Sequence, residues 1–170
     1  EGKIQILPSD RGKGYRVSAT HMFINKAWLD KLGLSMPTTW DELENVLKAF
    51  KTQDPNGNGK ADEVPMNIRG LNFGLWSALT LMNSTGVTTA FMGASAESQG
   101  YYVQDGKVKS YLTSDALKDT IKFLNKLQSE GLIPKDSLTR DGSKYAAQTT
   151  SDGKTAITGF SFGWSRQNEY

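Results

Sequence analysis

The chain contains no cysteine, a single histidine and no long apolar run. The absence of cysteine excludes disulfides, thiolate nucleophiles and zinc sites with sulfur ligands. It also fits a bacterial protein that folds outside the cytoplasm without disulfides, although many cytosolic proteins lack cysteine as well. A transmembrane helix needs about 18 or more consecutive apolar residues. We therefore expect no segment of this chain to insert into a membrane.

An excess of charge of one sign is also missing. The 170 residues include 20 Lys and Arg against 18 Asp and Glu, for a formal net charge of +2. The basic residues are scattered along the chain, whereas an electrostatic nucleic-acid binder concentrates them. We therefore expect no nucleic-acid partner. A hydrophobic fraction of 37% and a charged fraction of 22% are typical of a folded domain.

Recognisable catalytic patterns are absent too. The lone histidine, His21, precedes an apolar strand pattern and is interpreted as structural. The sequence contains no P-loop, no G-x-G-x-x-G phosphate cradle and no nucleophile elbow. Asp62 and Glu63 are adjacent, and adjacent carboxylates cannot easily flank a glycosidic bond from opposite faces. We predict a protein that is not an enzyme.

Helical and strand periodicities are both present. Thr39 and Glu42 form a capping box after Pro37, and apolar residues recur at helical spacing from Trp40 to Phe50. The sequence predicts further helices at Ala27–Leu32, Phe73–Ser84, Ser114–Glu130 and Ser143–Thr150, and strands at Lys3–Leu7, His21–Ile24, Val64–Ile68 and Thr155–Thr158. Short strands separated by helices predict an α/β fold around a small mixed sheet, with residues 1–170 as one domain.

Two finer expectations concern the second half of the chain. Asp105-Gly106 is a hairpin signal between strand patterns at Tyr101–Val103 and Lys107–Tyr111. In the long helix that follows, a buried stripe is expected at Leu117, Ile121, Leu124 and Leu127.

The densest polar segment is D-P-N-G-N-G-K-A-D-E, Asp54–Glu63. Its residues fit the ligand positions of an EF-hand calcium loop from position 1 to position 9, with Gly59 at the sharp turn. Position 12 is Pro65, which offers no ligand, so Glu63 is expected to close the shell. The candidate calcium ligands are Asp54, Asn56, Asn58, the Lys60 carbonyl, Asp62 and Glu63. The alternative interpretation is a solvated turn, because Asp, Asn and Gly favour turns in general.

Aromatic residues in Gly-rich segments suggest a carbohydrate site. Sugars present apolar C–H faces that stack on Trp or Tyr rings, and their hydroxyls need polar partners beside the ring. Asn72–Trp76 and Gly159–Trp164 combine both features at the ends of elements, where α/β folds place ligands. Phe73, Phe160 and Phe162 are interpreted as core residues. The predicted ligand contacts are Trp76, Trp164, Asn72, Tyr15 and Arg16.

The segment N-K-A-W-L-D-K-L-G-L-S-M-P-T-T-W-D-E-L, Asn25–Leu43, resembles the extracellular solute-binding proteins of family 1. The following K-A-F, the block D-P-N-G-N-G-K-A-D-E-V-P, and E-G-L-I-P near Gly131 are similar to the same family. These proteins are the substrate receptors of ABC-type sugar importers. Members of this family have two lobes with the periplasmic-binding-protein type II fold. The resemblance implies that this chain is the second lobe, cut from a longer protein.

The resemblance also implies a function and a setting. The partners would be an oligosaccharide, the other lobe of the receptor and ABC permease subunits. The location would be the extracellular face of the bacterial membrane or the periplasm, with a lipid anchor on the full-length protein. Alginate-binding members have an EF-hand-like loop similar to Asp54–Glu63, with a structural calcium distant from the sugar. The alternatives are a calcium-dependent polysaccharide-degrading enzyme domain and a calcium-stabilised adhesion or scaffold module.

Overall fold

The computed structural model describes residues 21–69, 71, 76–87 and 100–163. Several predicted features lie outside these described residues, namely the strand at Lys3–Leu7, the first part of the helix at Phe73–Ser84 and the ligand candidates Tyr15, Arg16, Asn72 and Trp164. No helix in the described part of the chain is long and apolar enough to cross a membrane.

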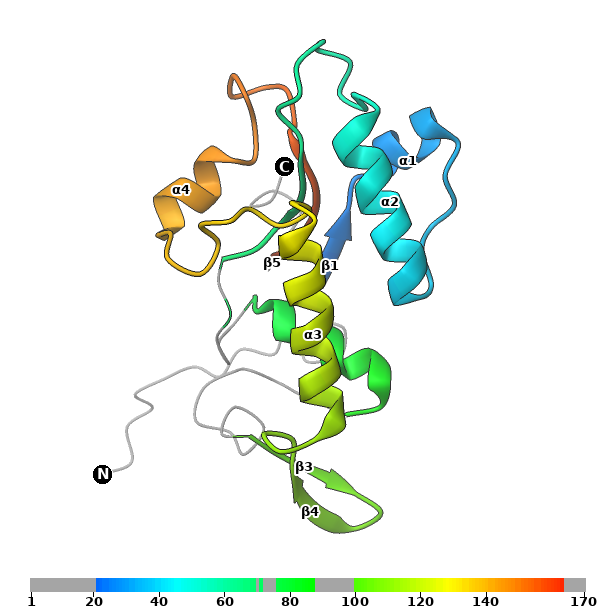
Figure 1. Cartoon of the computed structure of the whole chain (residues 1–170), viewed down its shortest axis with the longest axis vertical. Coiled ribbons are helices and arrows are strands. Elements are labelled where there is room, and N and C mark those ends of the chain that lie inside the picture. The colour runs from blue at the N-terminus through cyan, green and yellow to red at the C-terminus, as the bar shows by residue number, and fades with distance from the viewer. Residues whose placement is uncertain (1–20, 70, 72–75, 88–99, 164–170) are drawn as a thin grey trace, which may run out of the picture.

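A small mixed sheet lies at the centre of the fold (Figure 1). Its strands are β1 (His21–Ile24), β5 (Thr158–Gly163) and β2 (Val64–Asn67), in the spatial order β1-β5-β2. The middle strand β5 runs antiparallel to β1 and parallel to β2. Helices α1 (Lys26–Leu32), α2 (Trp40–Thr52) and α3 (Asp115–Ser129) lie beside this sheet, which confirms the predicted mixed α/β architecture.

The middle strand differs from its prediction. The sequence indicated a strand at Thr155–Thr158, but β5 begins where that segment ends. The rest of β5, Gly-Phe-Ser-Phe-Gly, belongs to the Gly-rich aromatic segment Gly159–Trp164, which the sequence placed at the end of an element, and glycine usually weakens strands. The structure shows why Gly159 is needed there: a Cβ at that position would lie 2.4 Å from the Phe50 ring and 2.8 Å from the Pro65 carbonyl oxygen. The strand therefore tolerates glycine because α2 packs directly on it. Phe160 and Phe162 are core residues, as predicted.

The first helices follow their local signals. Asn25 caps α1 by accepting a hydrogen bond from the Trp28 N–H, and Gly33 ends it in the left-handed conformation. The Thr39–Glu42 capping box is present at the start of α2. Phe50 is fully buried and meets Trp28 edge to face at 5.2 Å, so the two helices share one core.

The later helices correct three expectations. Ile121 is 45% exposed, and Thr120 and Phe123 are buried in its place on α3. The segment expected as a buried α-helix contains a 3-10 helix, η2 (Ala78–Thr85), which begins after the capping residue Ser77. The helix expected at Ser143–Thr150 is α4 (Gly142–Ala147) and ends three residues earlier.

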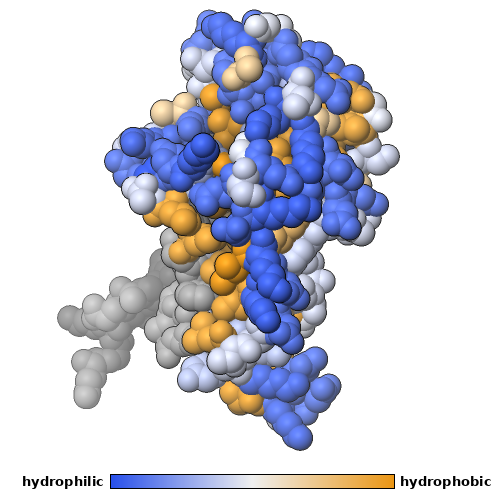
Figure 2. Space-filling view, in the orientation of Figure 1, coloured by the Kyte–Doolittle hydropathy of each residue, from blue (hydrophilic) through white to orange (hydrophobic). Residues whose placement is uncertain are grey.

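The predicted hairpin is confirmed as β3 (Tyr101–Gln104) and β4 (Lys107–Ser110), which projects from the bottom of the molecule in Figure 1. Above it, Figure 2 shows hydrophobic residues along one side of α3. A shallow groove on this helix is lined by apolar side chains, including Leu71, Ile121 and Leu138.

Candidate functional site

The oxygen-rich loop, Asp54–Glu63, joins the end of α2 to the start of β2. Three of its residues have a positive φ, namely Asp54 at 45°, Gly57 at 74° and Gly59 at 73°. The Lys31 ammonium of α1 donates to the Pro55 carbonyl at 2.9 Å, so the loop is tied to the helix beside it. The chain thus folds back on itself here, and the side-chain oxygens are directed into the loop.

Two carboxylates organise the interior of the oxygen-rich loop. Asp54 accepts hydrogen bonds from the backbone N–H groups of Gly57 at 2.9 Å, Asn58 at 3.1 Å and Gly59 at 3.0 Å. Asp62 accepts from the side-chain amides of Asn56 at 3.1 Å and of Asn58 at 3.1–3.2 Å. The predicted ligands Asp54, Asn56, Asn58 and Asp62 are therefore brought together by the fold of the loop.

Glu63 is the acid that was expected to close the loop. Its Oε1 atom is buried and has no hydrogen-bond partner within the described residues. Burial raises the pKa of Glu63, and the negative charges of Asp62 and Asp54 raise it further. A buried carboxylate oxygen beside two other acids is an arrangement that a bound cation stabilises.

The donor set of the oxygen-rich loop is made of oxygen atoms, which suits a hard cation such as Ca²⁺. In the described part of the chain, no group of three or more His, Asp or Glu side chains converges into a metal cluster. Carboxylates alone would therefore not complete a coordination shell. The amide oxygens of Asn56 and Asn58 and the Lys60 carbonyl are needed as well, and the amides would have to turn their oxygens toward Asp62. With those groups included, the residues fit the ion.

A second group of polar and aromatic side chains lies at the carboxyl end of β2. We call it the sheet-end cluster; its members are Asn67, Arg69, Trp76, Arg140 and Tyr145. Arg140 is 7% exposed, and its guanidinium donates to the Asn67 side-chain oxygen at 2.6 Å, to the Ile68 carbonyl and to the Gln148 side chain. Asn67 in turn donates to the Tyr145 carbonyl at 3.2 Å. Burial lowers the pKa of Arg140. These bonds hold α4 against the end of the sheet.

Arg69 lies between two aromatic rings of the sheet-end cluster. The carbon atom of its guanidinium is 4.6 Å from the Trp76 ring centroid and 4.4 Å from the Tyr145 ring centroid. Trp76 has a φ of 62°, which is rare for a bulky residue and marks local backbone strain. Of the predicted sugar contacts, Trp76 alone lies among the described residues. The sequence did not indicate Arg69, Arg140 or Tyr145, because nothing in their local sequence shows that they converge.

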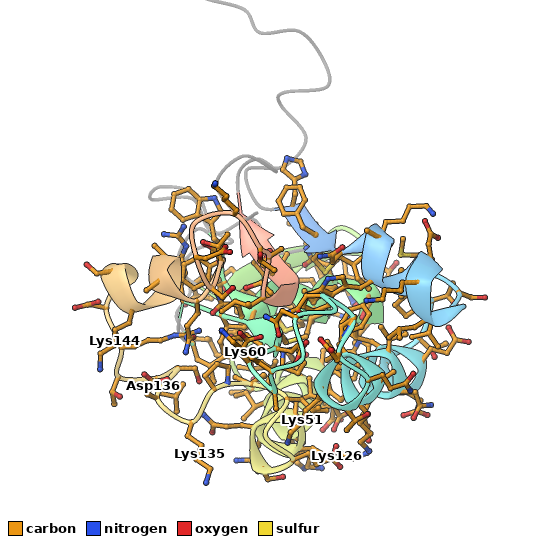
Figure 3. All side chains as sticks on the ribbon, turned by 90° about the horizontal axis from the view of Figure 1, so that it is seen from above. Lys51, Lys60, Lys126, Lys135, Asp136 and Lys144 are labelled. Carbon is orange, nitrogen blue, oxygen red and sulfur yellow. The ribbon has the colours of Figure 1, made fainter. Side chains whose placement is uncertain are left out.

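Lysines occupy a different face. Figure 3 shows Lys51, Lys60, Lys126, Lys135 and Lys144 on the side of the molecule away from the start of β1, with Asp136 among them. Acids are interspersed with these lysines: the Glu44 carboxylate lies 2.6 Å from the ammonium groups of both Lys48 and Lys126. Mixed charges on this face are consistent with the expectation of no nucleic-acid partner.

Comparison with known proteins places the chain among receptors for solutes. Residues 9–169 match the model of a family described as bacterial extracellular solute-binding protein. Over 148 residues, the chain is 38% identical to the fructooligosaccharide ABC transporter substrate-binding protein FusA of Streptococcus pneumoniae, covering 86% of this chain and 25% of FusA.

Two solved structures are similar in fold as well as in sequence. An HMO-binding, ABC-transporter-associated solute-binding protein from Bifidobacterium longum infantis superposes with a TM-score of 0.87 and 58% identity, covering 94% of this chain and 32% of that one. An EF-hand mutant of S. pneumoniae FusA in complex with fructo-nystose gives a TM-score of 0.76 and 34% identity, covering 91% and 29%. The chain therefore spans about a quarter to a third of the length of these relatives.

Proposed function

Because the chain belongs to the bacterial extracellular solute-binding proteins, we propose that it forms one lobe of an oligosaccharide receptor for an ABC importer. The membership also confirms the prediction of a protein that is not an enzyme. The observation that carries the proposal is the 58% identity, over 94% of this chain, to a solute-binding protein described as HMO-binding. The fructooligosaccharide specificity of FusA supports the same class of ligand.

The sheet-end cluster is the proposed ligand-binding part of this lobe. It lies at the carboxyl end of β2, and open α/β sheets bind ligands outside the carboxyl ends of their strands. A sugar ring would stack on the Trp76 indole, while Arg69 on the other side of the indole keeps its orientation. Trp164, Asn72, Tyr15 and Arg16 remain predicted contacts outside the described residues.

The receptor is proposed to work by closure. The other lobe of the receptor would cover the sugar, and the closed form would be presented to the permease subunits. The proposed location is the extracellular face of the bacterial membrane or the periplasm, with a lipid anchor on the full-length receptor. Half of a cleft offers half of the contacts, so this lobe by itself binds the sugar weakly.

We also propose that the oxygen-rich loop holds a structural Ca²⁺. The ligands would be Asp54, Asn56, Asn58, the Lys60 carbonyl, Asp62 and Glu63. The unpartnered Oε1 of Glu63 and the existence of an EF-hand in FusA support this proposal. The ion would stabilise the connection between α2 and β2 rather than contact the sugar.

The decisive experiment is sugar binding by the full-length receptor. Calorimetric titration with kestose-type fructooligosaccharides and a glycan array of other oligosaccharides would identify the ligand. Trp76→Ala is expected to lower the affinity for that ligand by about tenfold or more, because aromatic anchors dominate binding energies. The matched control is Tyr101→Ala, which removes an exposed ring from β3, outside the sheet-end cluster, and should leave the affinity unchanged.

Two outcomes would contradict the proposed function. Absence of binding to any oligosaccharide would argue for the adhesion or scaffold alternative. Release of shortened sugars during incubation would argue for a polysaccharide-degrading enzyme. Equal losses of affinity in Trp76→Ala and Tyr101→Ala would leave the receptor proposal standing but remove the sheet-end cluster as its site.

A further inference from the structure

The oxygen-rich loop contains both Asn-Gly pairs of the sequence, Asn56-Gly57 and Asn58-Gly59. In such a pair, the backbone nitrogen of glycine can attack the side-chain carbonyl of the preceding asparagine. Glycine favours this attack because it has no side chain to obstruct it and because its backbone reaches unusual conformations at little cost. Gly57 and Gly59 are exposed to solvent, so water and hydroxide can reach both pairs.

The reaction is deamidation. The glycine nitrogen forms a bond with the asparagine Cγ, the bond between Cγ and Nδ2 breaks, and the amide leaves as ammonia together with the proton from the glycine nitrogen. The product is a five-membered imide. Water then opens the imide at either carbonyl, which yields aspartate or isoaspartate. The only co-reactant is solvent water.

Asp54 holds the attacking nitrogen of both pairs. The Gly57 N–H donates to Asp54 Oδ1 at 2.9 Å, and the Gly59 N–H donates to Asp54 Oδ2 at 3.0 Å. A hydrogen bond to a carboxylate favours the protonated amide, whereas attack requires that the nitrogen lose its proton. Asp54 therefore opposes the first step at both pairs at once.

Asp62 holds the leaving amide of both pairs. Its carboxylate accepts from the Nδ2 atom of Asn56 and from that of Asn58. The Oδ1 atoms are held as well, because Asn56 accepts from the Asn58 N–H at 2.9 Å and Asn58 accepts from the Lys60 N–H at 2.8 Å. Each asparagine side chain is thus held at both ends, and these hydrogen bonds must break before its carbonyl can turn toward the following nitrogen.

We propose that Asn56 and Asn58 are sites of spontaneous deamidation, and that Asp54 and Asp62 suppress the reaction for as long as the loop stays closed. Opening of the loop releases the nucleophile and the leaving group together. The product replaces an amide donor by a carboxylate facing Asp62, in a loop that already contains Asp54 and Glu63. The modified loop is therefore more dependent on a cation than the original one. This proposal stands independently of the sugar specificity.

The test is the rate of deamidation, followed by peptide mass spectrometry as a mass increase and as isoaspartate at positions 56 and 58. The protein and a synthetic peptide of residues 53–64 are incubated in parallel at neutral pH with a chelator. The protein should deamidate more slowly than the peptide by about tenfold or more, a factor that corresponds to about 1.4 kcal/mol in the barrier. Equal rates in the protein and the peptide would overturn the proposal.

Variants of Asp54 test whether its carboxylate is the group that slows deamidation. Asp54→Ala should accelerate deamidation at both Asn56 and Asn58, toward the rate measured for the peptide. Asp54→Asn keeps one acceptor oxygen, so it should accelerate one of the two positions more than the other, and it is the variant to use if Asp54→Ala fails to fold. The matched control is Asp152→Ala, since Asp152 accepts two backbone N–H groups in another loop that has no Asn-Gly pair. Unchanged rates in Asp54→Asn, or an equal acceleration in Asp152→Ala, would overturn the proposal.

Discussion

The oxygen-rich loop and the sheet-end cluster are both dense groups of polar side chains, but they are assembled over very different distances in the sequence. The side-chain hydrogen bonds within the loop join residues two to six positions apart. In the cluster, Arg140 reaches Ile68 and Asn67, which are 72 and 73 positions away. The loop is therefore visible in the sequence, whereas the cluster exists only after the chain has folded.

The difference has an energetic consequence. The loop holds three carboxylates, and the Oε1 atom of Glu63 has no hydrogen-bond partner within the described residues. Under the calcium proposal, the stability of the loop therefore depends on an added cation. The cluster satisfies its buried cation, Arg140, with neutral oxygens and the Tyr145 ring from the same chain. We therefore expect substitutions in the sheet-end cluster to lower the free energy of unfolding. We expect the stability of the oxygen-rich loop to change with the calcium concentration of the solvent.

The largest expected effect is on the cluster. Arg140→Leu should lower the free energy of unfolding by about 3 kcal/mol, because the buried Asn67 oxygen and the Ile68 carbonyl would each lose a donor at a cost of about 1–3 kcal/mol. Urea denaturation measures the change. Lys144→Met, an exposed substitution on the neighbouring α4, is the control and should be close to neutral. A loss below about 1 kcal/mol in Arg140→Leu would mean that the cluster does not hold α4 in place.

The loop should respond to calcium. At a free calcium concentration about 100 times Kd, the ion should stabilise the protein by about 2.7 kcal/mol and raise the Tm by about 5–10 °C relative to chelator. Asp54→Ala should abolish the calcium-dependent part of the shift, while Asp152→Ala should retain it. If calcium leaves the Tm of the unmodified protein unchanged, the loop is the solvated turn of the alternative interpretation.

The long-range ion pair between Glu44 and Lys126 should contribute less to the free energy of unfolding than the buried Arg140 does. Hydrogen bonds from Lys126 and, to a smaller extent, Lys48 lower the pKa of Glu44 from its ordinary value of 4.5. A lowered folded pKa means that this stabilisation is present above pH 4.5 and is lost as the pH falls through the folded pKa. Both lysines are about half exposed, so Glu44→Gln should cost only about 1 kcal/mol at neutral pH.

The measurement for Glu44 is urea denaturation between neutral and acidic pH. The free energy of unfolding of Glu44→Gln should approach that of the unmodified protein as the pH falls below 4.5. A gap that stays constant over the whole pH range would show that Glu44 acts through packing rather than through its charge.

The smallest effect is expected for a local ion pair. Lys26 and Asp30 are one helical turn apart on α1, with an N–O distance of 2.6 Å and side chains that are 71% and 62% exposed. Lys26→Met should change the free energy of unfolding by less than about 0.5 kcal/mol. Thermal unfolding at low and high salt checks this, since a larger, salt-sensitive loss would contradict the ranking of long-range over local contacts.

Local signals predicted much of the fold. The Thr39–Glu42 box, the Asn25 cap, the Gly33 stop and the Asp105-Gly106 hairpin are all present, because each depends on residues a few positions apart. Expectations that needed tertiary information were wrong. The exposure of Ile121 depends on which side of α3 meets the core, and the position of β5 depends on the approach of Phe50 to Gly159.

The candidate sites divide in the same way. The ligand spacing of the oxygen-rich loop, its two Asn-Gly pairs and the family resemblance follow from the sequence, since the contacts involved are short-ranged. The position of Arg69 between Trp76 and Tyr145 does not, because β2, α4 and the segment between them must first be packed together. A residue's neighbours in the chain determine turns, caps and ligand loops, whereas only the tertiary structure decides which distant side chains share a buried site.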